Sequence, residues 1–161
     1  MKISHDIYAE MNPAFCALLL GVFVESYINT ANKFPDLPLI YVALPLLLSE
    51  EYIQQFEGTN KTTGLREWLS RNQNYDLDLS VRLNGCLNIV SEALQFGCFS
   101  GYLELKGNAQ LSLGENILKK SKINKIDSEL LKVVKCADRL GCWFAHAGST
   151  KAVFDIMGLT V

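Results

Sequence analysis

The sequence predicts a mostly α, winged-helix-like domain that contains one small β-hairpin. Three observations favour this class. Apolar residues recur at helical spacing over most of the chain. One pair of short alternating runs, residues 102–105 and 110–113, flanks the turn sequence Gly107-Asn108. The short pair of helices expected over residues 49–72 has the length of a helix-turn-helix, and the hairpin that follows would be its wing.

The first predicted helix starts at Asn12-Pro13, with Asn as the N-cap and Pro at the first helical position, and runs to about Ala31. It is apolar on most sides, so neighbours should cover more than one face. A second helix is expected from about Leu39 to Leu48, bent or ended by Pro45. Its apolar run is too short to cross a bilayer, and we expect no membrane segment and no signal peptide.

The middle of the chain predicts two short helices and one long helix. Ser49 should cap a helix over 50–56, and Thr62 or Thr63 should cap a helix from Leu65 to about Asn72. From Leu77 to Phe96 the apolar positions recur every three or four residues, which predicts one continuous amphipathic helix. The hairpin follows.

After a polar, lysine-rich stretch over 115–127, the apolar periodicity from Ser128 predicts a last long helix that stops at Gly148. Ser149 should then cap a short terminal helix. The chain stays apolar to its final residue, Val161, so this element should dock on its own core or on a partner. The candidate anchors, for the core or for an interface, are Trp143, Phe144, Phe154 and Met157.

Composition limits the function classes. The 161 residues suit a single domain spanning 1–161, and the net charge of −2 gives no overall attraction to nucleic acid or acidic membranes. Residues 1–60 carry two basic and seven acidic side chains, and the remainder carries thirteen and ten. The five cysteines are odd in number and lie in apolar contexts, which favours free thiols in a reducing cytoplasm.

No catalytic constellation is evident, so we expect no enzyme activity and no cofactor. There is no glycine-rich phosphate loop. Cys136, Cys142 and His146 have poor spacing for zinc, and core packing is the favoured interpretation. A thiol nucleophile paired with His5 or His146 is disfavoured because no local feature would lower a thiol pKa.

The one dense basic cluster is a candidate nucleic-acid contact, and its alternative is a solvated loop, which we favour. Its members are Lys119, Lys120, Lys122 and Lys125. The helix that would read DNA, residues 65–72, offers few polar side chains around Trp68, and Trp68 and Leu69 should be core.

Several segments, in order, support a family resemblance. They are Asn12-Pro13-Ala14, the proline-bracketed block 37–46, Thr62-Thr63-Gly64-Leu65 with Trp68-Leu69, Glu92 to Gly97 leading to Gly101 and the hairpin, and the terminal run through Leu140-Gly141, Trp143-Phe144-Ala145, Gly148-Ser149 and Val153-Phe154. The chain resembles the small middle component of bacterial three-component ABC systems, a class that includes the small subunit of Lamassu-type anti-phage defence.

The resemblance implies a non-enzymatic cytoplasmic adaptor that joins an SMC- or Rad50-like ABC ATPase to an effector, often a nuclease, in a defence complex. It carries over no catalytic residue, and the lysine cluster lies outside the matching segments, so DNA contact through the complex is not implied by the family. The alternative function is a stand-alone winged-helix DNA-binding regulator, which would need a more basic recognition face.

Overall fold

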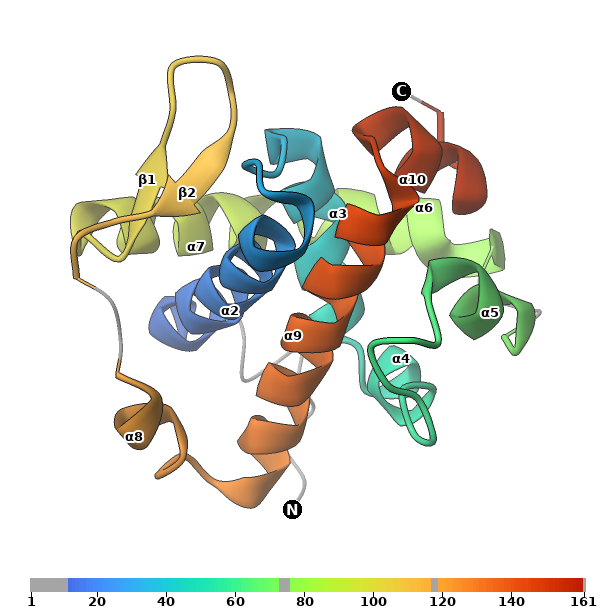
Figure 1. Cartoon of the computed structure of the whole chain (residues 1–161), viewed down its shortest axis with the longest axis horizontal. Coiled ribbons are helices and arrows are strands. Elements are labelled where there is room, and N and C mark those ends of the chain that lie inside the picture. Colours follow the sequence, from blue (N-terminus) through green and yellow to red (C-terminus); the bar gives the residue numbers. More distant parts are fainter. Residues whose placement is uncertain (1–11, 73–75, 117–118, 161) are drawn as a thin grey trace.

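A computed structural model describes residues 12–72, 76–116 and 119–160, and over these residues the chain is mostly helical, as predicted (Figure 1). One antiparallel hairpin accompanies nine helices in this described part. The elements are α2 (Pro13–Ala31), α3 (Leu37–Leu48), α4 (Glu50–Gln54), α5 (Leu65–Ser70), α6 (Asp76–Gly85), α7 (Leu87–Phe99), β1 (Leu103–Leu105), β2 (Leu111–Leu113), α8 (Lys120–Ile123), α9 (Ser128–Ala147) and α10 (Thr150–Ile156).

Helix α2 is the centre of the fold, with α9 as its principal partner and α7 as a second neighbour (Figure 1). Its start is as predicted, because the Phe15 amide donates to Asn12 Oδ1 at 3.1 Å. The helices α2 and α9 approach closely at Gly141. A Cβ there would lie 2.9 Å from Ser26 Cβ and closer still to the Phe23 carbonyl oxygen. Only glycine therefore fits this helix crossing without displacing backbone.

By length and composition alone, α2 could cross a membrane, and it is the one helix among the described residues that passes this test. In the fold, 61% of its most apolar window is buried. This burial is the pattern of a core helix, which agrees with the surrounding elements α3, α7 and α9 covering it.

Helix α3 starts earlier than predicted, at Leu37, because Pro38 lies in the first turn, where a missing amide costs no hydrogen bond. It continues through Pro45 to Leu48. The predicted threonine cap of α5 is wrong. Gly64 occupies the N-cap with φ 81°, and the Thr63 hydroxyl instead accepts from the Asn60 amide at 3.0 Å.

The single helix predicted over 77–96 is also wrong. The chain forms α6 and α7, separated at Cys86, whose φ of −100° and ψ of 1° leave the helical region. Gly85 ends α6, and its backbone freedom makes such a break inexpensive. The helix α7 then runs to Phe99, and Gly101 with φ 75° turns the chain into the hairpin.

The predicted hairpin is confirmed, with Glu104 opposite Ser112 in its register. The winged-helix arrangement is not confirmed. Figure 1 shows the hairpin on one side of α2 and α9 and the α4–α5 pair on the other, whereas a wing lies beside its recognition helix. Positive φ in the hairpin loop falls on Ala109, at 57°, rather than on Gly107 or Asn108.

The terminal helices form as expected. Asp127 caps α9 through the Glu129 amide at 2.9 Å, and Ser149 caps α10 through the Ala152 amide at 3.1 Å. Gly148, with φ 95°, reverses the chain between the two helices. The last apolar residue of this end of the chain, Val161, lies outside the described residues.

Candidate interaction surfaces

The four predicted anchors are buried in the chain's own core, so they support the fold and do not present their side chains to solvent. Their exposed fractions are 0% for Trp143, 0% for Phe144, 9% for Phe154 and 1% for Met157. Val153, beside Phe154 on α10, is also fully buried. The terminal helix is therefore docked on α3 and α9 of the same chain.

An aromatic stack fixes the α4–α5 connection against α9. The rings of Phe56 and Trp143 are parallel, with centroids 5.3 Å apart, and Trp68 packs 5.7 Å from Trp143. Both indole nitrogens donate to this connection, Trp143 Nε1 to the Asn60 carbonyl at 3.0 Å and Trp68 Nε1 to the Gln55 carbonyl at 3.1 Å. As expected, Trp68 is core and serves no recognition surface.

A cleft of about 420 Å³ lies between this connection and α9. One wall carries Lys132, Lys135 and Arg139, and the other includes Glu50 and Glu57. The guanidinium of Arg139 is already engaged, because Nη1 donates to the Phe56 carbonyl at 3.1 Å and to Thr59 Oγ1 at 3.2 Å. The cleft therefore has mixed charge, and one of its basic side chains, Arg139, is already committed to holding the fold together.

The cysteines near this cleft do not form an activated site. Burial raises the pKa of the Cys136 thiol to about 11, so the thiol stays protonated at neutral pH. Cys142 Sγ lies 3.7 Å from His146 Nδ1, one turn along α9. Cys136 is six residues from Cys142, and six helical residues rotate the side chain by about two-thirds of a turn. Among the described residues, no three possible metal ligands converge. His5 lies outside that part of the chain.

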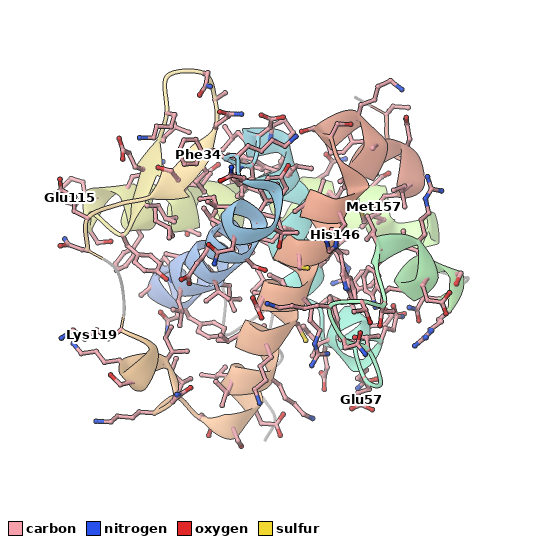
Figure 2. All side chains as sticks on the ribbon, viewed as in Figure 1. Phe34, Glu57, Glu115, Lys119, His146 and Met157 are labelled. Carbon is pink, nitrogen blue, oxygen red and sulfur yellow. The ribbon has the colours of Figure 1, made fainter. Side chains whose placement is uncertain are left out.

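The basic cluster is exposed at Lys119, Lys122 and Lys125, while the Lys120 side chain lies outside the described part. Figure 2 shows Lys119 pointing away from the body of the protein beside α8. In Figure 1, α8 lies far from the hairpin, towards the start of α9. The cluster is therefore free to contact a polyanion, but it does not extend the hairpin surface.

The helix α5 has little surface for base recognition. Leu65, Trp68 and Leu69 are buried, and the Arg71 guanidinium pairs with Glu67 at 3.1 Å. Arg66 is the remaining exposed basic side chain of this segment. A helix that must read DNA usually offers several polar side chains on one free face.

A polar junction, which sequence reasoning missed, joins three distant segments at Asp36. Its carboxylate accepts from Gln110 Nε2 at 3.0 Å and from Thr150 Oγ1 at 2.5 Å. The hydrogen bond from Thr150, and to a smaller extent the one from Gln110, hold the pKa of Asp36 below its ordinary value. Nearby, Lys33 Nζ donates to the Gly148 carbonyl at 2.8 Å. The junction connects the α2–α3 loop, the hairpin and the start of α10.

Exposed apolar side chains occur on α6, α7 and β1, and sequence reasoning missed these also. The exposed fractions are 98% for Phe99, 73% for Val81, 54% for Leu105, 46% for Leu87 and 45% for Phe96. The buried residues of α7 are Val90, Ala93 and Gly97. Helical spacing places Phe99 almost opposite this buried stripe, and this offset was the available sequence signal.

Among the comparisons with known proteins, one gives a match. No curated protein and no solved structure gives a match. One family does match, "ABC-three component (ABC-3C) system Middle Component 3", and the match covers residues 1–161. The chain therefore belongs to the Middle Component 3 family of ABC-three component systems.

Proposed function

We propose that the chain is a non-catalytic adaptor of a cytoplasmic bacterial anti-phage or anti-plasmid complex. In this role it links an SMC- or Rad50-like ABC ATPase to a nuclease-type effector, as in a Lamassu-type system. The observation that carries the proposal is the exposure of apolar side chains on α7 and β1, which pack against each other, with Phe99 98% and Leu105 54% exposed. Large apolar side chains left exposed on neighbouring elements typically mark a protein–protein interface.

The use of the polar side chains also supports an adaptor. Arg139, Asp36 and Lys33 are each engaged in joining one segment of the fold to another. Cys16, like Cys136, is held protonated, because burial raises its pKa to about 12. Such groups organise a scaffold, while a catalytic group needs a free atom facing a reacting centre.

The exposed lysines of 119–125 supply a second, smaller part of the proposal, which is contact with DNA within the assembled complex. Replacing Lys119, Lys120, Lys122 and Lys125 by Glu should weaken DNA binding by the complex and flatten its dependence on salt concentration. The control is Glu substitution of Lys132 and Lys135, which are exposed basic side chains of α9. An unchanged salt slope in the quadruple variant would assign the cluster to solvation.

The adaptor role is tested by expressing the chain, with an affinity tag, together with the genes that neighbour its own. We expect the ATPase and the effector to co-purify with it at fixed stoichiometry, and we expect the isolated chain to hydrolyse neither ATP nor DNA. Recovery of the chain alone, bound to DNA as a dimer, would instead support a regulator. ATP or DNA hydrolysis that a single substitution in this chain abolishes would refute the non-catalytic role.

A further inference from the structure

The α2–α3 loop lies between the hairpin and α10 (Figure 1). It is joined to the hairpin by two backbone hydrogen bonds. The Leu111 amide donates to the Pro35 carbonyl at 3.0 Å, and the Leu37 amide donates to the Ala109 carbonyl at 2.9 Å. The loop therefore follows β2 in the manner of a short third strand.

The side chain of Asp36 extends this connection to α10. Its backbone forms an isolated antiparallel bridge with Gln110, and its Oδ1 accepts from Gln110 Nε2 at 3.0 Å. Its Oδ2 accepts from Thr150 Oγ1 at 2.5 Å. Asn108 Nδ2 donates to Gln110 Oε1 at 2.8 Å, so the amide of Gln110 is oriented with its Nε2 towards Asp36. A single carboxylate thus connects the loop of the hairpin to the first residue of α10.

The carboxylate of Asp36 is not used to start α3. Asp36 occupies the N-cap of that helix, but its side chain makes no capping hydrogen bond. The same loop has a second link to the start of α10, because Lys33 Nζ donates to the Gly148 carbonyl at 2.8 Å. The side chains of Asp36 and Lys33 therefore both serve to join separate segments.

Neither of the two joined elements is long enough to be stable by itself. Each strand of the hairpin has three residues, and an isolated two-stranded hairpin is marginal in water. Leu103 and Leu111 are buried, but residues 104–110, the outer half of the hairpin, are exposed or half-buried. The helix α10 has seven residues, fewer than an isolated helix needs. Segments of this kind open locally, in cooperative units.

We propose that Asp36 couples the outer half of the hairpin to α10, so that the two open together and stabilising one stabilises the other. A coupling free energy between two sites is reciprocal. A binding partner that holds the hairpin in place would therefore also hold α10, and the reverse. This conformational link goes beyond the adaptor role, and it can be tested on the isolated chain.

The test is amide hydrogen exchange at residue resolution. The Lys106 amide, which donates to the Gln110 carbonyl at 2.8 Å, reports on the hairpin, and the Val153 amide, which donates to the Ser149 carbonyl at 3.1 Å, reports on α10. Thr150→Val removes the hydroxyl that bonds Asp36 and should speed exchange at both amides by roughly tenfold, because hydrogen bonds to charged groups are among the stronger ones. Gln110→Met should have the same effect from the hairpin side.

The controls are a matched variant and a distant amide. Thr30→Val removes a hydroxyl that donates to the Ser26 carbonyl at 2.8 Å within α2, and it should leave both reporter amides unchanged. The Val90 amide, which donates to the Cys86 carbonyl at 3.0 Å, reports on α7 and should change much less than either reporter in every variant.

Two results would overturn the proposal. If Thr150→Val speeds exchange only in α10 and Gln110→Met only in the hairpin, the two elements open independently. If the Val90 amide accelerates as much as the two reporters, the substitutions lower the stability of the whole fold and Asp36 does not define a local unit. Neither result would bear on the adaptor role, because no other component takes part in the experiment.

Discussion

The close crossing of α2 and α9 at Gly141 gives a quantitative prediction for the substitution Gly141→Ala. The added methyl group would meet backbone of α2 at Phe23, with Ser26 Cβ 2.9 Å away, and backbone cannot move aside as a flexible side chain can. Overpacking of this kind costs about 1–3 kcal/mol, and contact with backbone favours the upper part of that range. The higher helix propensity of alanine returns about 1 kcal/mol. The net expectation is a loss of about 2 kcal/mol in the free energy of unfolding.

The matched control is Gly85→Ala at the end of α6, where an added Cβ has no neighbour within 4 Å. It gains propensity without overpacking and should be neutral or more stable by up to about 1 kcal/mol. Urea denaturation should therefore separate the two variants by about 2–3 kcal/mol. The melting temperatures should differ by roughly 5–10 °C at this chain length. Equal stability of the two variants, or a more stable Gly141→Ala, would refute the close crossing.

Three further predictions concern the terminal helix, acid stability and thiol reactivity. Phe154→Ala should lower the free energy of unfolding by about 3–5 kcal/mol in thermal or chemical denaturation, because its ring is buried, and an unchanged value would contradict its place in the core. Since the pKa of Asp36 is lowered in the fold, its contribution is complete above the unfolded pKa of about 3.9 and is lost as pH falls through the lower folded pKa. Asp36→Asn should therefore make the free energy of unfolding decrease less steeply as the pH is lowered. A decrease as steep as that of the wild type would contradict the hydrogen bonds proposed to lower the pKa of Asp36. At pH 8 a thiol reagent should label exposed Cys98 rapidly in the folded chain, while Cys16 and Cys136, whose pKa values burial raises to about 12 and about 11, should react only on unfolding. If rapid labelling of the folded chain persists in the Cys98→Ser variant, the prediction is wrong.

Local signals in the sequence were sufficient for the helix starts at Asn12 and Ser149, because an N-cap is a hydrogen bond within a few residues of the chain. The break at Cys86 was missed because the apolar residues keep their helical spacing across Gly85. Hydrophobic periodicity alone cannot detect a single residue with non-helical backbone angles. The N-cap of α5 was predicted wrongly because Thr62, Thr63 and Gly64 are consecutive and each is a residue type found at N-caps.

The candidate surfaces were less accessible to sequence analysis because they depend on segments far apart in the chain. The partners of Asp36 are Gln110 and Thr150, and no spacing in the sequence relates them. The α2–α3 loop is joined to Ala109 and Leu111 by backbone hydrogen bonds that no local sequence signal indicates. The lysines of 119–125 were visible as a cluster, but their distance from the hairpin was not.

The pairing of α2 with α9 has a consequence for synthesis of the chain. The principal partner of the apolar helix α2 is α9, which is made only after roughly a hundred further residues. At translation rates of about 5–20 residues per second, α2 waits on the order of 5–20 s before α9 exists. Through that interval the nascent chain exposes an apolar helix, so the core around α2 closes only once α9 has been made.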